Sequence, residues 1–167
     1  RILVVGGFNL GGKSINTAEI YDPATGKYTL LGSFLKTGRA FHQAIKAKNG
    51  KVFLFGGYLD SNVATNTIEI FDPKTNTFSS SFEHLNIERA DFQALTIASG
   101  HILIAGGARS FSLQSKDSTC ENCEDSVEIY DPISQSITVL KASLTGPKAN
   151  FTLTSIDEDK LISIGGP

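Results

Sequence analysis

The chain repeats itself at an interval of 50 residues, and this repeat limits the possible folds more than any other feature. A glycine pair ends a short apolar run at four places: Gly6-Gly7, Gly56-Gly57, Gly106-Gly107 and Gly165-Gly166. The first three pairs are 50 residues apart and the fourth follows after 59, so the third copy carries nine inserted residues between Gly107 and Glu128. A fixed period of this length is typical of arrays of small structural units.

Two further motifs recur in phase with the glycine pairs. One is a Glu-Ile-aromatic-Asp-Pro step at residues 19–23, 69–73 and 128–132, and the other is a short segment with a basic residue at 38–41, 88–91 and 147–150. The apolar runs have turn residues on either side, which is typical of strands covered on both faces. Proline ends the second strand because it has no ladder donor. The sequence thus predicts four short strands in each copy.

Four short strands in about 50 residues, with no helical period, predict a blade of a β-propeller. The expected fold is all-β, a partial propeller of four-stranded antiparallel blades with about 13 strands. The glycine pair, the Asp-Pro step and the arginine that precedes the next strand together resemble Kelch repeats. The departures from that pattern are Tyr28, Phe78 and Ile137, where Kelch repeats often have Trp, and Lys148, where they have Arg.

The Kelch resemblance implies where the blades begin and end. Residues 1–167 are expected to form an incomplete propeller, with a partial blade at 1–31, blades at 39–82 and 89–140 (insertion at 108–126) and a partial blade at 148–167. A closed propeller takes roughly four to eight blades. The chain is therefore interpreted as a fragment whose remaining blades belong to the same protein. A ring completed by several copies is the alternative.

Charge and hydropathy exclude some classes of partner. The net charge is −2, and the lysines and arginines are dispersed, so no nucleic-acid partner is expected. No apolar run approaches the roughly 18 residues that span a bilayer. The compartment stays open, with an extracellular or cell-surface location as the favoured alternative.

Charged residues recur inside the predicted framework. A carboxylate in the middle of a covered strand is costly unless a cation pairs with it. Since a catalytic residue is needed once and a structural one in every blade, the repetition favours buried ion pairs that tie the blades together. The residues concerned are Glu19, Glu69 and Glu128, with Arg39, Arg89 and Lys148 as the cations.

In Kelch propellers the loops after the glycine pairs and the residues after the arginine commonly line one face of the disc. The resemblance therefore implies a binding surface whose residues differ between copies while the framework stays constant. Ordinary solvated turns are the alternative for each residue. A protein or carbohydrate ligand suits the mixture of aromatic, amide and charged groups. The candidate residues are Phe8, Asn9, Phe41, Tyr58, Asp60, Asp91, Arg109 and Asn150.

An enzyme is the less favoured function. The alternative is a fragment of a propeller enzyme, similar to galactose oxidase or a sugar epimerase, with its catalytic residues outside this chain. His42, His84 and His101 lie at unrelated points of the repeat, so neither a metal site nor another cofactor is expected. Cys120 and Cys123 lie in the insertion, where a local disulfide and two free thiols are both open.

Overall fold

The structure, a computed structural model, describes residues 1–110, 122–157 and 160–166. Within these ranges the chain forms thirteen strands and no helix, which confirms the predicted all-β fold. Accordingly, the described residues include no helix of the length and apolar character needed to cross a bilayer.

The strands form four antiparallel sheets in chain order. The first contains β1 (Ile2–Val5), β2 (Ala18–Asp22) and β3 (Lys27–Leu30). The second contains β4 (Gln43–Lys46), β5 (Val52–Phe55), β6 (Ile68–Asp72) and β7 (Thr77–Ser80). The third contains β8 (Gln93–Thr96), β9 (Ile102–Ala105), β10 (Ser126–Tyr130) and β11 (Ile137–Ser143), and the last contains β12 (Phe151–Ser155) and β13 (Leu161–Gly165).

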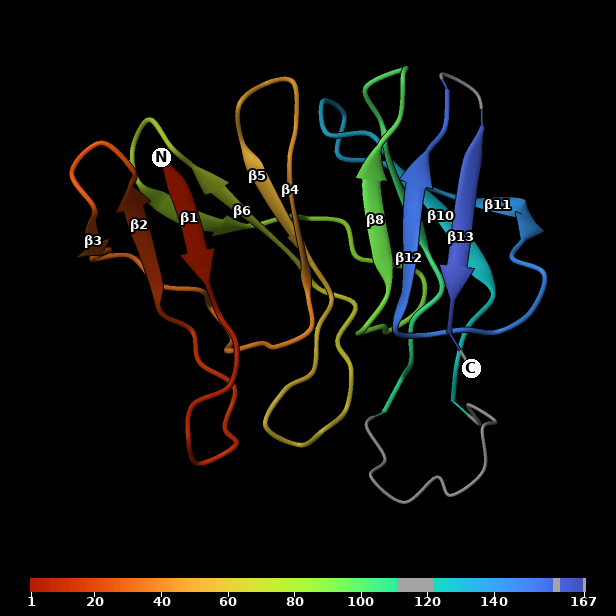
Figure 1. Cartoon of the computed structure of the whole chain (residues 1–167), viewed down its shortest axis with the longest axis horizontal. Helices are drawn as coiled ribbons and strands as arrows, with labels where there is room; N and C mark the ends of the chain where they lie inside the picture. The colour runs from red at the N-terminus through yellow and green to blue at the C-terminus, as the bar shows by residue number, and fades with distance from the viewer. Residues whose placement is uncertain (111–121, 158–159, 167) are drawn as a thin grey trace.

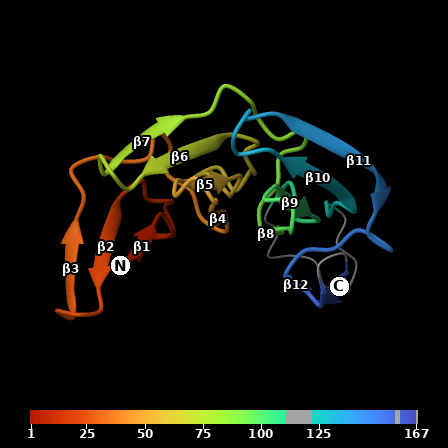
Figure 2. The same ribbon diagram turned by 90° about the horizontal axis from the view of Figure 1, so that it is seen from above.

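The sheets stand side by side along an arc, as in part of a propeller. Seen from above, β4, β8 and β12 lie on the concave side, whereas β3, β7 and β11 lie on the outside (Figure 2). The same repeat position therefore places a residue at the same radius in every sheet. Neighbouring inner strands are also linked directly, since Gln43 Nε2 of β4 donates to the Phe92 carbonyl just before β8 at 3.0 Å.

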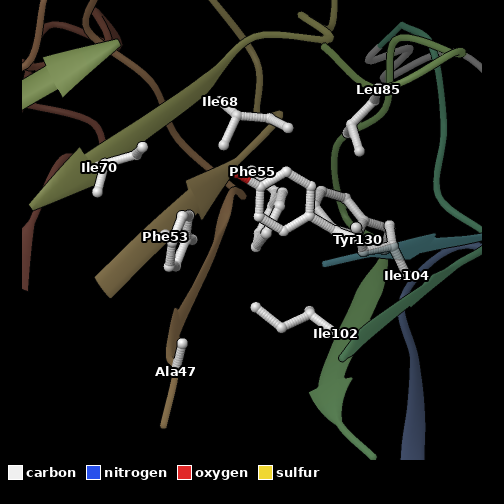
Figure 3. Close-up of a cluster of buried hydrophobic side chains, with 10 residues drawn as sticks. Ala47, Phe53, Phe55, Ile68, Ile70, Leu85, Ile102, Ile104 and Tyr130 are labelled. Atoms are coloured by element: carbon white, nitrogen blue, oxygen red, sulfur yellow. The ribbon is translucent and has the colours of Figure 1, made fainter. Parts of the chain in front are cut away.

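A hydrophobic core fills the space between each pair of neighbouring sheets. The largest lies between the second and third sheets, where Phe53 and Phe55 meet Tyr130 with ring centroids 5.3 and 5.2 Å away (Figure 3). Leu54, the residue between the two phenylalanines, points to the other side and joins Phe71 in the core against the first sheet. Burial of each such side chain stabilises the fold by about 1.5–3 kcal/mol.

The end sheets are covered on one face only, which differs from the expectation that every glycine-pair strand is buried on both faces. In β1, Leu3 and Val5 pack toward the second sheet while Ile2 and Val4 are 53% and 47% exposed. In β13, Ile164 is 58% exposed. No described sheet lies beyond either of them, so their outer faces have nothing to pack against.

The glycine pairs are where neighbouring sheets come closest. A Cβ on Gly56 would collide with the carbonyl oxygen of Arg89, which begins the next repeat, and with the ring of Phe92. The Gly57 N–H donates to that same Arg89 carbonyl at 2.9 Å. Gly56 also has φ +58°, a region that disfavours side chains. The pair is therefore a contact between repeats as well as a turn.

Candidate binding face

The first two loops after the glycine pairs emerge on one face of the arc, which we call the double-glycine face. Loops 8–14 and 58–64 hang from the lower edge in Figure 1, opposite the β4–β5 and β8–β9 hairpins. Each loop is a small hairpin with one antiparallel bridge, Phe8 to Ser14 and Tyr58 to Ala64. The third copy has the same bridge between Ala108 and Cys123. The double-glycine face comprises these loops and the residues just before the inner strands.

A buried ion pair supports this face from within the second sheet. Arg39 Nη2 lies 2.6 Å from Glu69 Oε1, and the two side chains are 0% and 4% exposed. The Arg39 guanidinium also donates to the carbonyls of Gly56 and Thr67 at 2.9 and 3.1 Å. Burial lowers the pKa of Arg39, and the Glu69 charge works against that shift. The pair fixes the chain entering the sheet to the ends of β5 and β6.

The third sheet repeats the arrangement, with Arg89 Nη2 2.8 Å from Glu128 Oε1. Each pair lies within one repeat and holds the incoming chain to its own sheet, which differs from the expected tie between blades. Glu19 and Lys148 occupy the same repeat positions in the end sheets. Neither has an ion-pair partner among the described residues.

Three residues at one repeat position are linked by a ladder of backbone hydrogen bonds along the concave edge. Phe41, Asp91 and Asn150, each just before an inner strand, have φ of +54°, +54° and +50°. The Asp91 N–H donates to the Phe41 carbonyl at 3.0 Å, and the Asn150 N–H donates to the Asp91 carbonyl at 3.1 Å. A left-handed conformation costs an L-residue about 1–2 kcal/mol. The ladder therefore keeps three strained residues of successive repeats side by side.

Aromatic rings gather at the first step of this ladder. The Phe41 ring contacts both Phe8 and Tyr58, with centroids 5.9 Å away in each case. Tyr58 is 3% exposed and contributes packing, whereas Phe8 and Phe41 are 39% and 49% exposed. The two phenylalanines thus present apolar surface on the double-glycine face.

Asp91 adds a partly buried charge beside the rings. Burial raises the pKa of its carboxyl group. Burial, followed by the Asp91 charge, raises the pKa of Tyr58 to about 12. No described side chain or N–H group donates a hydrogen bond to the Asp91 carboxylate, and none of the ion pairs in the described ranges includes it.

The other candidate residues bond to groups in the loops of the double-glycine face. Asn9 Oδ1 accepts from the N–H groups of Gly11 and Lys13, so this amide shapes its turn. Asp60 Oδ1 accepts from the Ser14 N–H and hydroxyl at 2.6 and 2.8 Å, which joins the first two loops. Arg109 pairs with Glu124 and is 54% exposed at its side chain. These three side chains lie on the double-glycine face, but the structure does not bring them to the aromatic group of Phe8, Phe41 and Tyr58.

His42 is a partly buried group that was not among the predicted site residues. Burial, followed by the charge of Arg39, lowers its pKa to about 4. Its Nδ1 has no well-aligned hydrogen-bond partner in the described ranges, although the Arg39 backbone partly opposes the lowering of its pKa. The equivalent positions carry Phe92 and Phe151, whose rings pack on Gly56 and Gly106 as the His42 ring packs on Gly6. His42 therefore fills a position that suits a phenylalanine.

The described residues contain no group of three or more His, Cys, Asp and Glu side chains that could hold a metal ion. Cys123 is disulfide-bonded. Of the two alternatives left open, two free thiols are therefore wrong for Cys123, and its pairing with Cys120, which lies outside the described residues, stays a prediction.

Comparison with known proteins points to one family and one fold. The family model described as "Kelch motif" matches residues 1–35 and 47–81. A solved structure described as "Structure of YjhT" superimposes with a TM-score of 0.76 at 20% sequence identity, over 98% of this chain. The chain spans 55% of the length of that structure. No curated protein matches the chain.

Proposed function

Because the chain belongs to the Kelch-repeat family, we propose that it is a binding module that holds a protein partner on its double-glycine face. The observation that carries the proposal is the exposed pair Phe8 and Phe41 beside the half-buried Asp91. Aromatic residues, phenylalanine included, are enriched in protein interfaces relative to the rest of the surface. We further propose that the same polypeptide supplies the remaining blades of a closed ring.

The two faces of the arc differ in the way that this proposal requires. On the double-glycine face the equivalent residues are Phe41, Asp91 and Asn150, three different chemistries on one backbone geometry. The opposite face repeats the Asp-Pro turn, where Asp22 and Asp72 each accept from the N–H two residues on at 2.9 Å. A surface that varies while its framework repeats is free to specialise for a ligand.

A protein is a better match than a carbohydrate because the candidate surface is long. It extends along three repeats, from loop 8–14 through the ladder to Arg109, and its loops are fixed to one another. Ser14 bonds to Asp60, and the Ala64 N–H donates to the Arg109 carbonyl at 2.7 Å. A rigid, extended surface of this kind loses little conformational entropy when a partner docks.

The test is a random peptide library displayed on phage and panned on the immobilised protein, followed by Kd measurements with the enriched peptides in solution. We expect Phe41→Asn to weaken binding about tenfold or more, as for a dominant interface residue. Asparagine keeps the left-handed backbone, because Asn150 already adopts it in the third position.

The matched control is Ile133→Ser, which removes an apolar side chain that is 86% exposed beside an Asp-Pro turn on the opposite face. It should leave Kd within about twofold. Peptides whose affinity falls with Ile133→Ser and not with Phe41→Asn would show that the partner uses the other face. Selective binding of glycans to the double-glycine face, with no peptide enriched, would replace the protein by a carbohydrate.

A further inference from the structure

Asp91 is a carboxylate without a counter-charge at the middle position of the ladder on the double-glycine face. The salt-bridged carboxylates within the described ranges are Glu69, Asp72, Glu124, Glu128 and Asp157, and each has its own lysine or arginine. Asp91 has none, and no hydrogen-bond donor in the described part of the chain reaches its side chain. A partly buried charge that lacks both is unfavourable for the isolated protein.

The backbone holds this charge in place. Asp91 has φ +54°, donates its N–H to Phe41 and accepts from Asn150 with its carbonyl, so the ladder fixes it from both sides. Strained residues persist where the surrounding structure determines them, and they concentrate at functional sites. The ladder accounts for the left-handed backbone of Asp91, whereas no contact within the described residues compensates its charge.

The surroundings match one kind of ligand group. The Phe41 ring belongs to the residue bonded to Asp91 through the ladder, and it is 49% exposed. Lysine and arginine side chains combine a cation, which pairs with a carboxylate, with affinity for the face of an aromatic ring. Anionic groups and neutral sugars would leave the Asp91 charge unpaired.

We propose that Asp91 is the anchor for a lysine or arginine side chain of the protein partner, which pairs with its carboxylate while lying against the Phe41 ring. This proposal rests on the proposed function, because it specifies the chemistry of a partner on the same face. It commits to a basic segment as the occupant, on the grounds of charge complementarity. Phe41 supplies the apolar contact and Asp91 the selection for positive charge.

The test uses two small probes that differ in charge and scarcely in shape, N-acetyl-arginine amide and N-acetyl-citrulline amide. Each is titrated into the ¹⁵N-labelled full chain, and backbone amide shifts are followed by NMR. We expect the arginine probe to shift the Phe41, Asp91 and Asn150 amides in a saturable way, and the citrulline probe to bind at least tenfold more weakly.

Asp91→Asn should remove the preference for arginine without unfolding the chain, because asparagine occupies the same conformation at position 150. The matched control is Asp72→Asn, which removes a carboxylate charge from an Asp-Pro turn on the opposite face. It should leave the arginine affinity within about twofold. A second readout is urea unfolding, in which Asp91→Asn should raise the midpoint at pH 7, since it removes an unpaired charge.

Equal shifts with both probes, or arginine binding that survives Asp91→Asn, would overturn the proposal. If panned peptides bind the double-glycine face through Phe41 while the arginine probe does not bind, this inference is wrong and the proposed function stands. If no peptide depends on Phe41 and the arginine probe still binds through Asp91, the cation site stands and the proposed protein partner is wrong.

Discussion

The Glu69 carboxylate accepts hydrogen bonds from three donors. Its Oε2 accepts from the Lys36 N–H at 2.7 Å, and its Oε1 accepts from the Thr37 N–H at 3.4 Å and from Arg39 at 2.6 Å. The first two donors belong to the connection that arrives from the first sheet. Glu69 therefore binds that connection to β6 as well as neutralising Arg39, which explains why a buried charge is kept at this repeat position.

Replacing Glu69 by Gln should destabilise the protein strongly. The Arg39 guanidinium would stay buried without its counter-charge, which typically costs about 3–5 kcal/mol. Lys51→Met is the control, because Lys51 and Asp72 form an exposed pair at 4.0 Å whose loss should cost less than about 1 kcal/mol. Urea unfolding measures both. Equal losses in the two variants would mean that the buried pair contributes no more than an exposed one.

A methyl group at Gly56 tests the close contact between repeats. Gly56→Ala meets the Arg89 carbonyl, whereas Gly26→Ala, at φ +67°, meets no atom within 4 Å. The backbone conformation alone costs about 1–2 kcal/mol in both variants. Gly56→Ala should therefore lose clearly more stability than Gly26→Ala in urea unfolding, and an equal loss would show that the glycine is there for its φ alone.

At the scale of the strands, most of the fold could be predicted from the periodicity of the sequence. The run Val52–Phe55 alternates between the cores on its two sides, so a wholly apolar run correctly predicts a strand covered on both faces. The ladder at Phe41, Asp91 and Asn150 could not be predicted, because phenylalanine is not typical of the left-handed region. Asp and Asn at the equivalent positions were the only signal. Nor did the sequence predict that Tyr58 is buried, since this depends on rings contributed by other repeats.

The equivalent positions of the other repeats, which carry phenylalanine, indicate how His42 at the start of the second sheet affects stability at acid pH. Its pKa is about 4 in the folded chain and near 6.5 when unfolded, so the unfolded state binds more protons between these values. His42 therefore contributes no penalty above about pH 6.5 and lowers stability as the pH falls toward 4. The loss at pH 5 is about 2 kcal/mol.

The variant His42→Phe, which copies Phe92 and Phe151, should remove this acid sensitivity. Its gain in unfolding free energy over the wild type should be larger at pH 5 than at pH 7. The measurement is urea unfolding at both values, with His84→Phe as the control because His84 is an exposed histidine. A gain that does not change with pH would show that His42 is not kept neutral by the fold.

On the scale of the whole molecule, stability depends on how many neighbours a sheet has. In repeat architectures each unit contacts only adjacent units, so the contributions add along the array. The second and third sheets are covered on both faces and share the largest core, including Phe53, Phe55 and Tyr130. The first and last sheets each leave one apolar face exposed, with Val4 at 47% and Ile164 at 58%.

This difference should appear as a gradient in native-state hydrogen exchange. Amides of β5, β6 and β9 should exchange most slowly, and those of β1 and β13 should exchange through local opening at a lower free energy. Phe55→Ala, which opens a cavity in the central core and should cost about 3–5 kcal/mol, should accelerate exchange in both middle sheets together. Ile164→Ser, on the uncovered face of β13, should leave exchange of β5 and β9 unchanged. Uniform protection of all four sheets, or faster exchange of β5 in Ile164→Ser, would show that the chain unfolds as one cooperative unit and that its stability is not set sheet by sheet.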